Sequence, residues 1–180
     1  SAKENSSTRS KLLQDLVLER LSGSSAKNIV TGPMARGLEL ESEARQAYEL
    51  ENQKITLTGF INHPTIKEAG ASPDGLVGED GLIEIKCLNL KNHNDIVKKQ
   101  TLSKQYNIQI QFQLACTNRA WCDFVAYHPE SDQSLYVKRV LPEGELIKDI
   151  HEKAIIFVGE VEEKYRAMKE RNSEELYKYL

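Results

Sequence analysis

Apolar residues recur at helical spacing in three stretches of the chain. Residues 10–22 have them at Leu12, Leu13, Leu16, Val17 and Leu21, and Gly23 follows. Residues 34–52 are rich in strong helix formers, and one face of that stretch presents Gly37, Glu41, Ala44 and Tyr48. Residues 143–168 repeat apolar side chains with the period of a long helix. We therefore predict a helix in each of the three stretches.

The middle of the chain follows the shorter period of β-strands. Residues 54–60, 121–128 and 134–140 contain many β-branched and aromatic side chains, which favour strands. Residues 71–77 and 81–87 are two more apolar runs, and the dipeptide Asp80-Gly81 between them favours a hairpin turn with positive φ. The expected sheet is mostly antiparallel.

Two segments of this middle region are ambiguous. Residues 91–100 fit either a helix or a loop. In residues 106–116, YNIQIQFQLAC, apolar and polar residues alternate as in a strand, but the glutamines and the lack of turn residues also permit a helix. Periodicity alone favours a strand here.

Composition indicates one ordinary globular domain. A chain of 180 residues that is 39% hydrophobic and 28% charged is long enough to bury a core, so we expect a single domain over residues 1–180. The polar start SAKENSSTRSK lacks the apolar stretch of a signal peptide, and no later run approaches the ~18 apolar residues of a membrane helix. The three cysteines contain no CxxC pair and are expected to be free thiols. We expect a soluble, cytoplasmic protein.

The charge is distributed unevenly. A net charge of -3 disfavours a protein that coats nucleic acid nonspecifically. Between residues 86 and 104, however, Asp95 is the only acid among five lysines. This segment is either a solvated surface or a local anion-binding face.

The second run of the hairpin contains an unusual pair of charges. Alternation along the strand places Glu84 and Lys86 on one face and the apolar residues 83, 85 and 87 on the other. Asp74 lies on the preceding strand and can face this pair. Two carboxylates held close together require a cation or a shifted pKa. Oxygen ligands without histidine or thiolate favour Mg²⁺ or Mn²⁺ over zinc.

Such a site suits metal-assisted hydrolysis of a phosphodiester. In that reaction Lys86 would orient the attacking water or offset the charge that grows in the transition state. A structural explanation is also open, in which Glu84 and Lys86 keep a strand soluble and Asp74 serves the turn SPDG.

The same residues resemble a known family. Pro-Asp, nine residues and then Glu-Ile-Lys match the PD-(D/E)XK nuclease signature, and the string SPDGLVGEDGLIEIKC is similar to the phage lambda exonuclease group, the YqaJ-like viral recombinases. The stretches RGLELESEAR, YNIQIQF and FVAYHP match in the expected order. The resemblance implies an α/β (α+β type) fold with a restriction-endonuclease-like core, in which helices flank a central mixed sheet.

The resemblance also implies roles for single residues. It makes Asp74, Glu84 and the main-chain carbonyl of Ile85 metal ligands, Lys86 the catalytic lysine, and Glu41 the helix acid that completes the metal site. The implied cofactor is Mg²⁺, with Mn²⁺ as a substitute and two ions per site. None of the four histidines is assigned to catalysis.

Residues 106–117 become a helix under this resemblance, which overrides the strand expected from alternation. Tyr106, Gln109 and Gln111 match the family's Y-x-x-Q-x-Q segment, in which a glutamine supports the active site, and we assign that role to Gln109. Ordinary surface polarity is the alternative for the glutamines.

Candidate DNA contacts come from five residues: Arg45, Tyr106, Lys98, Lys99 and Lys104. Arg45 lies four residues after Glu41, so it either forms a helical ion pair or approaches a DNA phosphate. The three lysines either line a DNA path or cover a solvated helix face.

Members of the group act on duplex DNA and degrade one strand from its 5′ end to mononucleotides. The resemblance therefore implies a metal-dependent 5′→3′ exodeoxyribonuclease of phage or prophage recombination, a homotrimer that encircles DNA, and a single-strand annealing protein as partner. Two other functions stay open: an endonuclease of the same fold, of restriction or repair type, and a catalytically inactive member that only binds DNA or a protein. The intact set of Glu41, Asp74, Glu84 and Lys86 disfavours the inactive member.

Overall fold

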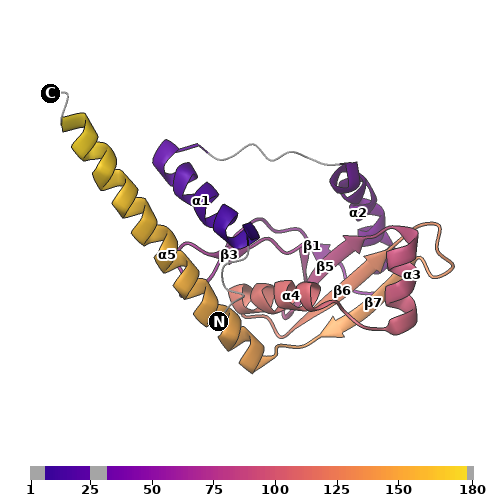
Figure 1. The fold of residues 1–180 in the computed structure, drawn as a ribbon. Helices are drawn as coiled ribbons and strands as arrows, with labels where there is room; N and C mark the ends of the chain where they lie inside the picture. The colour runs from indigo at the N-terminus through magenta and orange to yellow at the C-terminus, as the bar shows by residue number, and fades with distance from the viewer. Residues whose placement is uncertain (1–6, 25–31, 178–180) are drawn as a thin grey trace. The chain divides into compact units, whose positions relative to one another are not determined.

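A five-stranded mixed sheet forms the centre of the computed structural model, which describes residues 7–24 and 32–177 (Figure 1). Its strands, in spatial order, are β1 (Ile55–Thr56), β4 (Gly75–Val77), β5 (Gly81–Cys87), β6 (Trp121–Tyr127) and β7 (Leu135–Val140). Strands β5 and β6 are parallel and the other neighbours are antiparallel. A separate antiparallel pair joins β2 (Ile61–Asn62) to β3 (Gly70–Ala71). The mixed sheet predicted for this fold class is confirmed.

Two helices connect the parallel strands, because parallel neighbours need a crossover rather than a tight turn. These are α3 (Leu90–Lys99) and α4 (Lys104–Thr117). The side chain of Asn89 caps α3 by accepting from the N–H of Asn92, and Ser103 caps α4 by accepting from the N–H of Tyr106. Residues 91–100 therefore lie mostly in a helix, and residues 106–117 are helical, as the family resemblance implied and as alternation did not.

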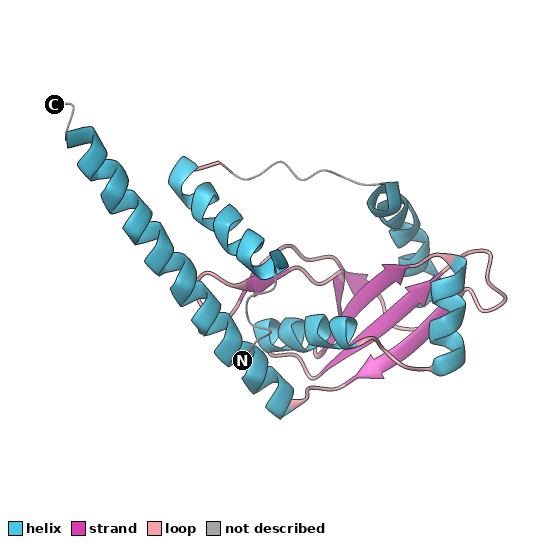
Figure 2. Cartoon of the chain, viewed as in Figure 1, coloured by secondary structure: helices cyan, strands magenta, loops and turns pink. Residues whose placement is uncertain are grey.

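The core has two layers because helices cover both faces of the sheet (Figure 2). Helix α2 (Gly32–Glu51) packs Ala44 and Tyr48 against Ile83 and Ile85 of β5. On the opposite face, α4 packs its apolar side chains against β5 and β6, in a cluster that contains Leu82, Ile110, Leu114 and Phe124. Strand β5 is thus buried on both sides.

Two details of the strands differ from the prediction. Strand β1 covers only two residues of the predicted 54–60, since it pairs with just Leu76 and Val77 of the three-residue strand β4. The β4–β5 hairpin is confirmed, but the residue with positive φ in its turn is Gly78, at 56°. Gly81 serves packing instead, since a Cβ there would lie 2.2 Å from the Trp121 ring.

Contacts divide the chain into two compact units, one of residues 30–151 and one that joins residues 1–29 to residues 152–180. In the second unit, α1 (Ser7–Ser22) and the part of α5 (Gly144–Tyr177) beyond residue 151 bury Val17 and Val161. Arg9 and Glu160 link these two helices, with Nη1 2.8 Å from Oε2. Both predicted terminal helices are confirmed. A single domain over residues 1–180 stays a prediction.

The three cysteines are free thiols, as expected. Burial raises the pKa of Cys87 and of Cys116 to about 11, so neither is a reactive thiolate at neutral pH. Within the described residues, no helix combines the length and the apolar character that crossing a bilayer requires.

Candidate active site

Strand β5 presents Glu84 and Lys86 to the α4 side of the sheet, as the alternation of side chains predicted. Glu84 is almost completely buried, with 1% of its surface exposed. Lys86 Nζ lies 2.5 Å from Glu84 Oε1, so the two charges form an ion pair. A carboxylate buried this deeply is stable only with partners, and Lys86 is one of them.

Two glutamines of α4 also donate to the Glu84 carboxylate. Gln109 Nε2 lies 2.7 Å from Oε1, and Gln113 Nε2 lies 2.6 Å from Oε2. They are four residues apart on one helix, which places both amides on the face that meets β5. Both oxygens of Glu84 are therefore hydrogen-bonded, and the orientation of the carboxylate is fixed.

Asp74 comes directly before β4, the strand next to β5. The strand predicted over residues 71–77 is therefore shorter in the structure, because β4 covers only its last three residues and Asp74 lies outside it. Its Oδ2 accepts a hydrogen bond of 2.6 Å from the backbone N–H of Ile85. Burial raises the pKa of Asp74 to about 7, the negative charge of Glu84 adds to this, and Glu41 contributes further, although the hydrogen bond from Ile85 opposes the shift. Negative charge therefore accumulates around Asp74.

Lys86 stays charged in this setting. Burial alone would lower the pKa of Lys86, but the charge and hydrogen bond of Glu84, together with the charge of Asp74, raise it above its ordinary value. The ammonium group also lies 5.6 Å from the centre of the Tyr106 ring. A lysine held in its protonated form can donate hydrogen bonds and stabilise negative charge, but it cannot accept a proton from water at neutral pH.

Glu41 reaches the same region from α2. Its Oε1 pairs with Arg45 Nη1 at 2.5 Å, so the i, i+4 ion pair that the sequence offered is formed. Glu41 is still close enough to Asp74 and Cys87 to raise the pKa of each. The charge of the helix acid thus acts on Asp74.

The candidate ligand atoms are all oxygens, which are the type that a hard divalent cation binds. Carboxylates and a main-chain carbonyl are the ligands that Mg²⁺ and Mn²⁺ prefer. Burial, and secondly the charge of Glu84, raise the pKa of Asp74, and a bound cation would offset both effects by favouring the ionised carboxylate. In the described part of the chain, no three His, Cys, Asp or Glu side chains are already gathered around one point. Asp74, Glu84 and the carbonyl of Ile85 are the nearest candidates.

A family model for the YqaJ-like viral recombinase domain matches residues 2–120 of the chain, a range that includes Glu41, Asp74 and Glu84. The chain belongs to this family. The YqaJ-like match covers more than half of the sequence and agrees with the resemblance found in the sequence alone.

Solved structures agree with the family assignment. The chain is similar to the alkaline exonuclease LHK-Exo from Laribacter hongkongensis, with 38% identity over 94% of this chain and 88% of that one and a TM-score of 0.89. The same enzyme in complex with dAMP matches over 96% of this chain and 89% of the other, again with 38% identity and a TM-score of 0.89.

A phage-related exonuclease from Haemophilus somnus 129PT shares the fold, at 17% identity over 92% of this chain and 86% of that one and a TM-score of 0.69. A search of curated proteins found no match. Together with the mixed sheet, the similarity to LHK-Exo shows the PD-(D/E)XK, restriction-endonuclease-like fold.

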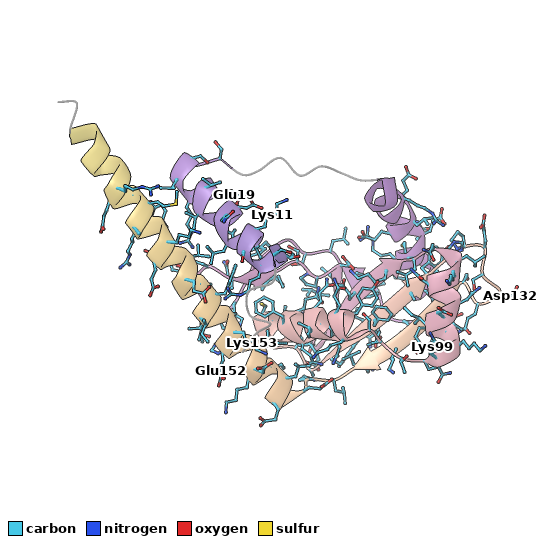
Figure 3. The ribbon with its side chains drawn as sticks, viewed as in Figure 1. Lys11, Glu19, Lys99, Asp132, Glu152 and Lys153 are labelled. Atoms are coloured by element: carbon cyan, nitrogen blue, oxygen red, sulfur yellow. The ribbon has the colours of Figure 1, made fainter. Side chains whose placement is uncertain are left out.

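The three lysines predicted to contact DNA lie on exposed helix ends. Lys98 and Lys99 occupy the last turn of α3, where Figure 3 labels Lys99. The Lys99 side chain is 65% exposed, and its Nζ lies 3.9 Å from Asp95 Oδ2. Lys104 is the exposed first residue of α4. Arg45 is engaged with Glu41, and the Tyr106 ring stacks on Phe124.

Sequence reasoning missed Gln113 and grouped Gln111 with Gln109. Gln111 is turned away from Glu84: its Nε2 donates to the carbonyl of Leu141, and its Oε1 accepts from the N–H of Glu143. The i, i+4 spacing of Gln109 and Gln113, applied to a helix, would have found the right pair.

Proposed function

We propose that the chain is a metal-dependent exodeoxyribonuclease that hydrolyses one strand of linear double-stranded DNA from its 5′ end to mononucleotides, in phage or prophage recombination. The observation that carries this proposal is the buried Glu84–Lys86 pair beside Asp74, in a chain 38% identical to an alkaline exonuclease. A structural ion pair would not require a second acid beside it whose pKa is raised by burial and by the charge of the first acid.

The proposed metal ligands are Asp74, Glu84 and the main-chain carbonyl of Ile85, with Glu41 completing the site. Mg²⁺ is the proposed cofactor, with two ions per site and Mn²⁺ as a substitute. When bound, the metal would polarise the scissile phosphate and lower the pKa of a bound water. The hydrogen bond from Ile85 to Asp74 supports this set because it holds two of the ligating residues together across adjacent strands.

Lys86 is proposed as the catalytic lysine. Because its pKa is raised, it would act as a positive charge and a hydrogen-bond donor toward the phosphate oxygens in the transition state, rather than as a base. Gln109 supports the site through its hydrogen bond to Glu84. Arg45, Tyr106, Lys98, Lys99 and Lys104 are proposed DNA contacts.

Duplex DNA with a free end is the proposed substrate, and a homotrimer that encircles it is the proposed assembly. A single-strand annealing protein is the proposed partner. LHK-Exo is described as an exonuclease and has been crystallised with dAMP, a deoxynucleoside monophosphate, which supports DNA as the polymer.

The proposal is tested by incubating the purified protein with linear duplex labelled at the 5′ or the 3′ end, with Mg²⁺ and with EDTA. We expect Mg²⁺-dependent release of labelled mononucleotide. A 5′ label should be released at once, whereas a 3′ label should be released only after the strand that carries it has been degraded from its 5′ end. Replacing Lys86 with Ala should reduce turnover by roughly 10³-fold or more while the protein stays folded. Lys67→Ala, which changes an exposed lysine outside the site, is the matched control.

Other outcomes separate the alternatives. Cleavage of covalently closed circles would favour an endonuclease of the same fold. Tight binding of duplex without any hydrolysis would favour an inactive member. A wild-type rate in Lys86→Ala would remove Lys86 from the mechanism.

A further inference from the structure

Gln113 is a deeply buried group that touches the candidate active site. It is 1% exposed, and its Nε2 donates to Glu84 Oε2 at 2.6 Å. Its other amide atom, Oε1, is buried and has no hydrogen-bond partner among the described residues. Of the two polar atoms of this amide, only Nε2 therefore makes a hydrogen bond in the described part of the chain.

An unpaired buried amide oxygen destabilises a protein, so stability alone gives no reason for a glutamine at this position. An apolar side chain of similar length would fill the same space against β5 without leaving an oxygen unpaired. The alternative amide orientation would point Oε1 at the Glu84 carboxylate, which is repulsive. What the glutamine contributes is the hydrogen bond from Nε2.

That hydrogen bond reaches the less occupied oxygen of Glu84. Oε1 already accepts from Lys86 and Gln109, whereas Oε2 accepts from Gln113 alone in the described part of the chain. A carboxylate oxygen can accept two hydrogen bonds or ligand bonds, so Oε2 keeps one position for a further partner. The donor that orients Oε2 is neutral, and it adds no positive charge that would repel a cation.

We propose that Gln113 is a positioning residue, which holds Glu84 so that Oε2 is available to a divalent cation. This inference rests on the proposed function, because it requires Glu84 to be a metal ligand. Groups that orient a metal ligand through hydrogen bonds commonly change metal affinity by roughly 10–100-fold when they are removed.

The test compares two buried glutamines of the same helix. Gln113→Met removes the donor to Glu84 and keeps the side-chain volume, whereas the matched control Gln111→Met removes hydrogen bonds to the backbone near Leu141 and Glu143. Mn²⁺ affinity is measured by isothermal titration calorimetry, and thermal unfolding is measured in EDTA. We expect Gln113→Met to weaken Mn²⁺ binding roughly 10–100-fold, and Gln111→Met to lower the melting temperature but leave the affinity unchanged.

Activity gives an independent readout. The Mn²⁺ concentration that half-saturates DNA hydrolysis should rise in Gln113→Met, and excess Mn²⁺ should restore most of the rate, while KM for DNA at saturating Mn²⁺ stays as in wild type. If Gln113→Met does not fold, Gln113→Asn replaces it. Asn keeps the amide but is one methylene too short to reach Glu84.

Two results would overturn the inference while the proposed function stands: wild-type Mn²⁺ affinity in a folded Gln113 variant, or an equal loss of affinity in Gln111→Met. A wild-type protein that neither binds Mn²⁺ nor cleaves DNA would instead overturn the proposed function, and this inference with it.

Discussion

The Asp74 carboxyl group is placed where ionisation costs free energy. Its folded-state pKa of about 7 lies above the ordinary value of 3.8 because it is buried next to Glu84. In the metal-free protein, folded Asp74 therefore binds its proton more tightly than unfolded Asp74 does. Its contribution to stability is fully present below about pH 4 and declines as the pH rises from about 4 through 7.

Asp74→Asn should therefore stabilise the metal-free protein at pH 8. Asn keeps an oxygen that can accept from the N–H of Ile85 and removes the charge. Because Asp74 is only partly buried and its ionisation depends on that of Glu84, we expect a gain of about 1–2 kcal/mol. Urea unfolding in EDTA at pH 5 and pH 8 measures the gain, which should shrink at pH 5.

Loss of Mn²⁺ binding should accompany that gain in stability if Asp74 is a ligand. Calorimetric titration of the same Asp74→Asn sample measures it. A variant that is less stable than wild type at pH 8 would mean that ionisation of Asp74 does not destabilise the folded protein. Unchanged Mn²⁺ affinity would count against its role as a ligand.

His63, outside the cluster of acids, should make stability depend on pH with the opposite sign. Its Nδ1 accepts from the N–H groups of Thr65 and Ile66, both at 3.2 Å, so this nitrogen must carry no proton. Burial, and secondly the neighbouring His151, lower the pKa of His63 below its ordinary 6.5. Stability from this group is present above about pH 6.5 and is lost as the pH falls below it.

His63→Asn should weaken that pH dependence, because the Asn side chain supplies an acceptor that does not titrate. Melting temperatures of wild type and variant, measured from pH 8 to pH 5, should differ in slope below pH 6.5, with the steeper fall in wild type. Parallel curves over the whole range would show that His63 is not held neutral by its two backbone donors.

The residues of the candidate site were predictable where alternation along a single strand determines their positions. Alternation along β5 placed Glu84 and Lys86 together, and the hairpin brought Asp74 to the same place. Gln113 was not predictable in this way, since residues 106–116 alternate like a strand and their true period depends on the Ser103 cap and on packing against β6. Roles for Glu41 and Gln109 came from the family resemblance.

At the scale of the elements, helices with one apolar face and strands with β-branched residues were predictable, whereas turn geometry was not. The Asp80-Gly81 pair marked the hairpin, but Gly78 adopts the positive φ and Gly81 makes room for Trp121. The length of β1 was also overestimated, because β-branched residues favour a strand over residues 54–60 but only two of these residues pair with β4.

Helix α3 ends in a conformation that does not suit its sequence. Gln100 has φ 51° and ψ 28°, the left-handed region, which is strained for residues other than Gly and Asn. Gln100→Gly should raise the free energy of unfolding by about 0.5–1 kcal/mol, measured by urea denaturation. The backbone carbonyl that accepts from Lys138 Nζ is retained in the variant.

The C-cap of α4 provides the control. Asn118 has φ 53°, but Asn tolerates this region, so Asn118→Gly should gain less than Gln100→Gly. An equal gain at both caps, or a loss at Gln100, would mean that strain at the end of α3 is not relieved by glycine.

At the scale of the whole molecule, the charge limits how the protein can stay on DNA. A net charge of -3 cannot provide a broad electrostatic hold on a polyanion, and the proposed contacts Lys98 and Lys99 are few and exposed. A ring would retain DNA by topology instead. The proposed homotrimer should therefore have a mass of about 61 kDa by light scattering, three times the 20.4 kDa of one chain.

A topological hold predicts a specific response to salt. Raising the salt concentration should slow the loading of the protein on duplex ends, because phosphate contacts are screened, but it should barely change the number of nucleotides removed per binding event. The measurement adds an excess of unlabelled duplex as a trap after loading and follows the length of labelled strand degraded at 50 and 200 mM salt. Lys98→Ala should reduce loading without shortening the degraded tract. If the degraded length falls in parallel with loading, or the protein is a monomer in solution, electrostatic contacts and not a ring hold the substrate.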